Sequence, residues 1–94
     1  MNEMSLREQI QCLEAMESDL RDFCRLMRES MDSFQSDIKY LRSNGFSTEK
    51  EEKYQQEYYT PANNDVNQVI SDIYGLHLHY LDEVIENLKR ALNS

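Results

Sequence analysis

Residues 6–41 read LREQIQCLEAMESDLRDFCRLMRESMDSFQSDIKYL, and neither glycine nor proline interrupts them. Within this stretch a core-type residue recurs every three or four positions. The repeat consists of Leu6, Ile10, Leu13, Glu17, Leu20, Cys24, Met27, Met31, Phe34, Ile38 and Leu41, of which only Glu17 is charged. This spacing is a heptad seam and predicts one helix about 54 Å long. Such a helix cannot cover its own apolar face, so it needs a helical neighbour of similar length.

The chain offers one strong turn signal. Ser43-Asn44-Gly45 predicts the end of the first helix, because glycine readily adopts the left-handed conformation that terminates helices. Thr48 and Glu51 then match a capping box, which predicts the start of a second helix. We therefore expect an all-α helical hairpin of two long antiparallel helices in a single domain, residues 1–94, with a helix over 5–43, a turn over 44–47 and a helix over 48–92.

Thr60-Pro61 complicates the second helix. Pro61 can occupy the first turn of a new helix capped by Thr60, or it can kink a continuous helix. A true reversal there would create a third helix and leave half of the first helix uncovered. We therefore expect a kink or short break near 59–63.

Two neighbouring apolar tracks follow in the second helix. The outer track consists of Val66, Val69, Ile73, Leu76 and Tyr80, and the inner one of Ile70, Tyr74, His77, Leu81, Val84 and Leu88. A helix with two adjacent apolar stripes faces two neighbours, which predicts that two hairpins pair into a four-helix bundle. The predicted partner-binding residues are this outer track with Phe46 and Tyr54 at the turn.

Ten basic against 18 acidic residues give a formal net charge of −8. The deficit is spread along the chain, which disfavours binding to nucleic acid or to anionic membranes. No stretch approaches the roughly 20 apolar residues of a membrane span. The N-terminus lacks the basic flank and apolar core of a classical signal peptide. We expect a cytoplasmic protein without membrane insertion, with export by a route that reads another signal left open.

Two residues interrupt the apolar pattern. Glu17 is the single charge in the first seam, and two interpretations stay open. It either snorkels to water near the end of a bundle, or it selects a partner by pairing with a cation across an interface. Gly75 lies in mid-helix, where it costs about 1 kcal/mol relative to alanine. Close approach of a neighbouring helix or a local kink would account for it.

The sequence contains no constellation typical of an enzyme, so we expect no catalytic residue and no cofactor. His77 and His79 stand two apart on a helix and point in roughly opposite directions, while His79 with Glu83 supplies only two ligands. No metal site is expected. Cys12 and Cys24 are about 18 Å apart along a helix and cannot pair within one chain. They are interpreted as small buried hydrophobes, with an intermolecular disulfide or a reactive thiol as the alternatives.

The hairpin, the acidic balance and the aromatic turn together resemble the WXG-type helical-hairpin proteins of type VII secretion. In that family a Trp-x-Gly turn is followed by an aromatic residue eight positions after the tryptophan. Here Phe46 stands at the tryptophan position, Thr48 at the glycine position and Tyr54 at the later aromatic. The tryptophan and the motif glycine are absent, and no tyrosine is followed by an acid four residues on, the pattern typical of exported members.

The resemblance implies a divergent member that travels with a signal-bearing partner. Our hypothesis is a small, non-enzymatic binding module that dimerises, or that acts as a targeting or chaperone subunit. Its partner would be a second copy, a related small helical protein, or the helical N-terminal region of a larger exported toxin. Two alternatives stay open: a cytoplasmic self-associating coiled-coil adaptor or regulator, and an acidic immunity protein that covers a basic toxin.

Overall fold

The computed structural model describes residues 3–94, and all regular structure in that range is helical. The first helix is a single element, α1, spanning Leu6–Ser43. After a short turn the chain stays helical through five consecutive segments. These are α2 (Thr48–Tyr54), η1 (Gln55–Tyr59), α3 (Thr60–Asp72), η2 (Ile73–Leu78) and α4 (His79–Asn93), of which η1 and η2 are π-helical. The predicted all-α class is confirmed.

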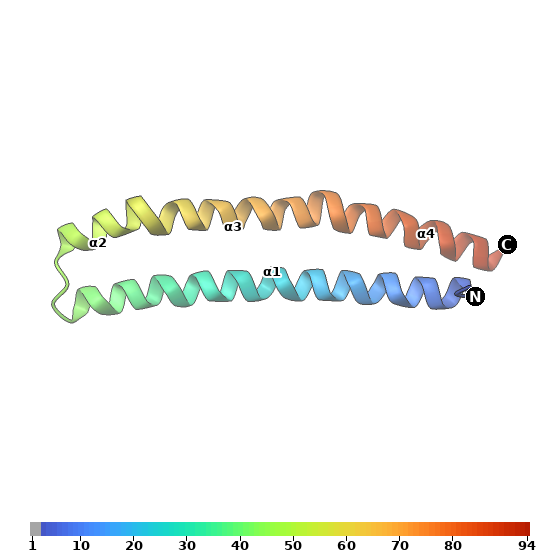
Figure 1. The fold of residues 1–94 in the computed structure, drawn as a ribbon, viewed down its shortest axis with the longest axis horizontal. Helices are drawn as coiled ribbons and strands as arrows, with labels where there is room; N and C mark the ends of the chain where they lie inside the picture. The colour runs from blue at the N-terminus through green and yellow to red at the C-terminus, as the bar shows by residue number, and fades with distance from the viewer. Residues whose placement is uncertain (1–2) are drawn as a thin grey trace. The chain divides into compact units, whose positions relative to one another are not determined.

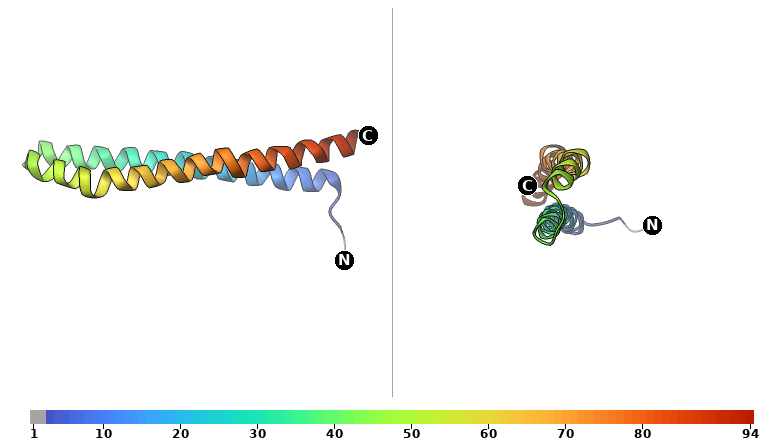
Figure 2. Two further views of the ribbon diagram at one scale, coloured as in Figure 1. Left: turned by 90° about the horizontal axis from the view of Figure 1, so that it is seen from above. Right: turned by 90° about the vertical axis from the view of Figure 1, so that its left-hand side faces the viewer.

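The chain divides into two compact units. The turn unit, Arg25–Ile70, contains the second half of α1, the turn, and the helix that returns from it. The terminal unit combines the first half of α1, up to Cys24, with Ser71–Ser94. Within each unit the two helical segments run antiparallel and side by side in every view (Figures 1 and 2). The hairpin is therefore confirmed, while pairing of two hairpins into a four-helix bundle stays a prediction.

The turn follows the predicted stop signal. Gly45 has a φ of 101°, the left-handed conformation that a side chain disfavours. The Phe46 N–H donates to the Leu41 carbonyl at 3.0 Å, and the Asn44 N–H donates to the same oxygen at 3.1 Å. These bonds satisfy a carbonyl that the end of α1 would otherwise leave unpaired.

The start of the returning helix differs from the predicted capping box. Ser47, not Thr48, is the N-cap, and its hydroxyl accepts a hydrogen bond from the Lys50 N–H at 3.2 Å. Because the cap lies one residue earlier, Glu51 is not the reciprocal member of a box. It is instead buried, and its carboxylate pairs across the turn with the Arg42 guanidinium at 3.4 Å.

The core is thin, as two helices alone require. Among the described residues the buried apolar side chains are Ile10, Cys24, Ile38, Tyr59, Ile73, Leu78, Leu81 and Ile85. The predicted burial of both cysteines holds for Cys24 and is wrong for Cys12, which is exposed; both are free thiols. The first three buried residues belong to the predicted heptad seam, and the others mark the face that the returning helix turns inward.

Pro61 does not break the returning helix. The backbone stays helical through it, and the departure from α geometry lies earlier, in η1. The Thr60 N–H donates to the Gln55 carbonyl, five residues back, as in a π-turn. In an α-helix the proline ring would press on the carbonyl four residues before it. That carbonyl belongs to Glu57, which lies within the wider turn of η1. The predicted kink or break near 59–63 is therefore replaced by a π segment.

The second π segment changes which residues face inward. The buried positions Ile73 and Leu78 are five residues apart, and Leu81 and Ile85 then continue the inner face. An uninterrupted α-helix would turn a residue near Leu76 inward, yet Leu76 is 66% exposed. The two predicted tracks therefore do not form two separate faces. Ile73 of the first track and Leu81 of the second are both buried, whereas Val69, Leu76 and Tyr80 of the first track and Tyr74 of the second are exposed.

Gly75 lies inside η2, and a Cβ placed there meets no atom within 4 Å. The predicted close approach of a neighbouring helix is therefore not found within the chain, and the local irregularity is the π segment. We expect Gly75→Ala to raise the free energy of unfolding by about 0.5–1 kcal/mol, because alanine restricts the unfolded chain. Urea denaturation measures this. A loss of stability would show that Gly75 is needed for the π-turn or for an intermolecular contact.

Candidate protein-binding surface

The structure separates the seven predicted partner-binding residues by exposure. Leu76, Tyr80 and Val69 are exposed, the first two by about two thirds, at 66% and 65%. Val66 is half-buried. Ile73 is buried at 6% exposure, so its predicted place on an exposed outer track is wrong.

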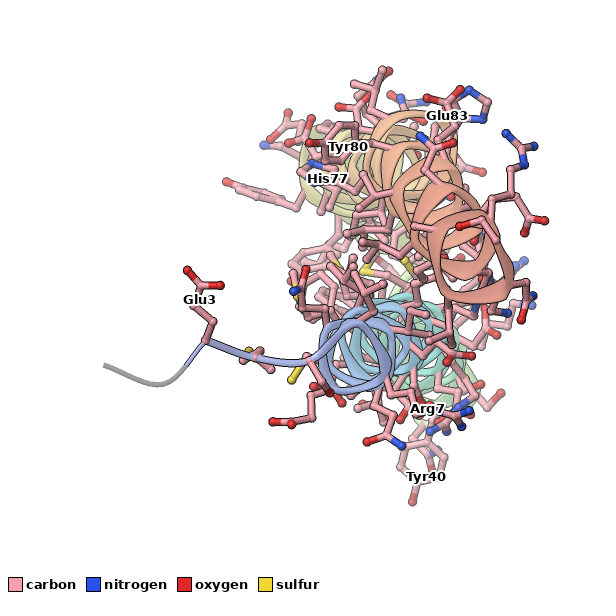
Figure 3. All side chains as sticks on the ribbon, turned by 90° about the vertical axis from the view of Figure 1, so that its right-hand side faces the viewer. Glu3, Arg7, Tyr40, His77, Tyr80 and Glu83 are labelled. Atoms are coloured by element: carbon pink, nitrogen blue, oxygen red, sulfur yellow. The ribbon has the colours of Figure 1, made fainter. Side chains whose placement is uncertain are left out.

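Leu76 and Tyr80 line an open groove in the terminal unit. This Tyr80 groove has a volume of about 730 Å³ and is lined by Met16, Asp19, Leu20, Leu76, His77, Tyr80 and Leu81. Figure 3 shows His77 and Tyr80 on one side of the C-terminal helix and Glu83 on another. Since Met16 is also half exposed, the groove presents apolar side chains from both helices of the unit.

Phe46 and Tyr54 line a second groove, in the turn unit. This Phe46 groove has a volume of about 720 Å³ and is lined by Leu26, Glu29, Ser30, Ser33, Phe34, Asp37, Ile38, Leu41, Phe46 and Tyr54. Phe46 is half-buried and Tyr54 is 37% exposed. Most of the lining comes from α1, and the two predicted aromatics close the groove from the turn and from α2.

An aromatic cluster adjoins the Phe46 groove, and two of its members, Phe34 and Tyr54, line the groove. The Phe34 ring lies 5.8 Å from that of Tyr59 in an edge-to-face arrangement and 6.0 Å from that of Tyr54. Tyr54 in turn lies 5.2 Å from Tyr58, centroid to centroid. Such pairs add to the stabilisation from apolar burial alone. These contacts fix the position of the Tyr54 ring, which also lines the groove.

Comparison with protein-family models, with curated proteins and with solved structures finds no match to this chain. Its function has therefore to be argued from its own surface.

Glu17 faces a second carboxylate. It is half-buried, and its Oε2 atom has no hydrogen-bond partner among the residues that the structure describes. Asp82 raises the pKa of Glu17, chiefly because a protonated Glu17 can donate a hydrogen bond to Asp82, then through burial and through charge repulsion. Glu14 adds to the rise and Arg21 opposes it. Neither interpretation of Glu17 included its proximity to Asp82. Selection of a partner by Glu17 stays a prediction.

The histidines follow the expected geometry. His79 Nε2 lies 3.1 Å from Glu83 Oε1, and both side chains are largely exposed, so the pair is a surface contact. In the described part of the chain no group of three or more His, Cys, Asp or Glu side chains is placed to hold a metal ion. Over the same residues, no helix is both long and apolar enough to span a bilayer.

Sequence reasoning missed the contribution of α1 to both grooves. The residues concerned lie beside the heptad seam and include Met16, Leu26, Ser30 and Ser33. A signal existed at Met16, which stands one residue before a core position and widens the apolar stripe. Leu26 carries a comparable signal, since it stands next to core position Met27 and is 53% exposed.

Proposed function

We propose that the chain is a non-enzymatic helical binding module that presents apolar surface to a helical protein. The Tyr80 groove is the observation that carries this proposal. Leu76, in η2, and Tyr80, in α4, keep about two thirds of their area exposed although both are large apolar side chains. Adjacent exposed apolar side chains that line one groove are typical of interaction sites, whereas single exposed ones are ordinary.

The total accessible surface supports the proposal. The chain exposes 7206 Å² at a mass of 11.2 kDa. A compact monomer of this mass exposes about 5,700 Å², so the excess is about 1,500 Å². A standard protein interface covers about 800 Å² on each partner. The chain therefore exposes more surface than a compact monomer of its mass, and pairing of two hairpins into a four-helix bundle is one way to cover part of that surface.

We further propose that the partner belongs to type VII export. The resemblance to WXG-type hairpins motivates this, and the position of Phe46 and Tyr54 around the turn is consistent with it. On this proposal the chain dimerises, pairs with a related small helical protein, or serves as targeting or chaperone subunit for the helical N-terminal region of an exported toxin. Detection of the chain in culture supernatant would support export; a chain retained in the cell would favour the adaptor.

Sedimentation equilibrium with circular dichroism over a wide concentration range tests the binding module. Tyr80→Ser removes an aromatic from the groove, and Tyr40→Ser is the matched control because Tyr40 is 69% exposed and lines neither groove. We expect the chain to self-associate, with an affinity that Tyr80→Ser lowers and Tyr40→Ser leaves unchanged. If the natural partner is a different protein, we expect the isolated chain to be poorly helical. A stable, fully helical monomer at every concentration would contradict the proposal.

A further inference from the structure

The Phe46 groove has the dimensions of a helix-binding site. Its α1 wall runs from Leu26 to Leu41, fifteen residues on, which is about 22 Å along the axis. Bulky leucines stand at the two ends of this wall, and the small Ser30 and Ser33 stand between them. Phe34 and Ile38 line the same stretch, so small and large side chains alternate along the wall, and side chains of a partner helix can pack over the two serines.

The charged side chains that line the groove are all acidic. Glu29 and Asp37 are its only ionisable carboxylates, and no lysine or arginine lines the groove. Glu29 pairs with Arg25 at 3.2 Å, but both side chains are more than half exposed and such pairs contribute little. Asp37 has no ion-pair partner among the described residues. The groove therefore offers two carboxylates, eight residues apart, to whatever covers it.

The two lysines that follow the turn, Lys50 and Lys53, lie on a different surface. Lys50 and Lys53 line a separate hollow that shares only Phe46 and Tyr54 with the groove. The aromatic pair thus stands between the carboxylates on α1 and the lysines on α2. A partner is consequently expected to carry cations on the flank that faces α1.

We propose that the Phe46 groove binds an amphipathic helix of about four turns, matched to the 22 Å wall, with two basic side chains about two turns apart beside its apolar face. The proposal rests on the proposed function, since it assumes that the chain is a binding protein. A second copy fits less well, because a two-fold contact centred on this wall would bring Glu29 and Asp37 of both copies together. The net charge of −8 disfavours that contact further.

Two synthetic helices are the probes. Both are capped 18-residue peptides with one leucine face; one carries two lysines two turns apart on the flank of that face, and the other carries glutamates there. Binding of the fluorescein-labelled peptides is measured by anisotropy at low and at high salt. We expect the lysine peptide to bind about tenfold more tightly at low salt, as two weak ion pairs allow, with the preference fading as salt rises.

The double variant Glu29→Gln/Asp37→Asn is expected to remove most of this preference, because it removes the groove's carboxylates. Asp32→Asn is the matched control, since Asp32 is exposed on the same helix and does not line the groove. Circular dichroism verifies that both variants stay helical. Equal binding of the two peptides, an equal effect of the control, or failure of the lysine peptide to bind would overturn the proposal.

A second copy as the occupant would overturn it as well. In that case the wild-type chain would self-associate, and the double variant would associate more tightly because the like charges are gone. Failure of the proposed function would give a different result from failure of this groove assignment. The wild-type chain would then be a stable monomer, and Tyr80→Ser would leave its monomeric state unchanged. If the peptides fail while Tyr80→Ser still weakens association, only the Phe46 groove assignment falls.

Discussion

Leu78→Ala is expected to lower the free energy of unfolding by about 3 kcal/mol, whereas Leu76→Ala should change it by less than about 0.5 kcal/mol. The two substitutions remove the same atoms two residues apart. Leu78 is 2% exposed and Leu76 is 66% exposed. Truncation of the first leaves a cavity that two helices cannot close, and truncation of the second removes a group that water already reaches.

Urea denaturation followed by circular dichroism measures both changes, at two protein concentrations. Loss of core packing is independent of concentration, whereas loss of a contact between chains is not. A Leu76→Ala effect that grows with concentration would therefore report association through the Tyr80 groove. If Leu76→Ala proved the more damaging substitution at low concentration, the helix would follow an ordinary α register and the π segment η2 would be absent.

Helix α1 and the turn could be predicted from the sequence alone. Helix α1 was predictable because its seam continues unbroken from Leu6 to Leu41, and the turn because Gly45 is the glycine that adopts a left-handed φ. The returning helix was harder. Its pattern was interpreted at a constant 3.6 residues per turn, and a single π segment is enough to move every later side chain around the axis. This accounts for the exposure of Leu76, which follows the buried Ile73 by three residues.

The candidate site was predictable to a smaller extent. Leu76, Tyr80, Phe46 and Tyr54 were named from the sequence, and each lines one of the two grooves. The wall residues beside the seam, such as Leu26, Ser30 and Ser33, were not predicted to line a groove, because a heptad analysis assigns residues only to the core or to solvent. The position of Asp82 relative to Glu17 is a tertiary relation between distant parts of the chain, and no local pattern contains it.

Glu17→Gln is expected to stabilise the hairpin at pH 7. The wild-type carboxylate is half-buried beside Asp82, and its Oε2 atom has no hydrogen-bond partner among the described residues. A neutral amide removes the repulsion and can donate to the Asp82 carboxylate. Glu17→Leu should stabilise by about 1–2 kcal/mol, since an apolar side chain completes the seam. Thermal and urea unfolding measure both changes.

The pH dependence of this gain has a definite sign. The folded-state pKa of Glu17 is raised above its ordinary value of 4.5. Between that value and the folded pKa the native state binds more protons than the unfolded state, so wild-type stability falls as pH rises through this window. The advantage of Glu17→Gln should therefore be small below pH 4.5, grow through the window, and level off above it.

Asp32→Asn separates the proximity of Asp82 from a general effect of net charge. It removes one negative charge from the same helix fifteen residues after Glu17, where the side chain is exposed and does not contribute to the raised pKa of Glu17. We expect it to reproduce little of the stabilisation and to leave the pH dependence in place. Equal behaviour of the two variants would mean that the acidic balance of the chain, and not the Glu17–Asp82 pair, controls its stability. If Glu17→Gln destabilised the chain at pH 7, the charged form of Glu17 would instead have a favourable partner, as the partner-selecting interpretation requires.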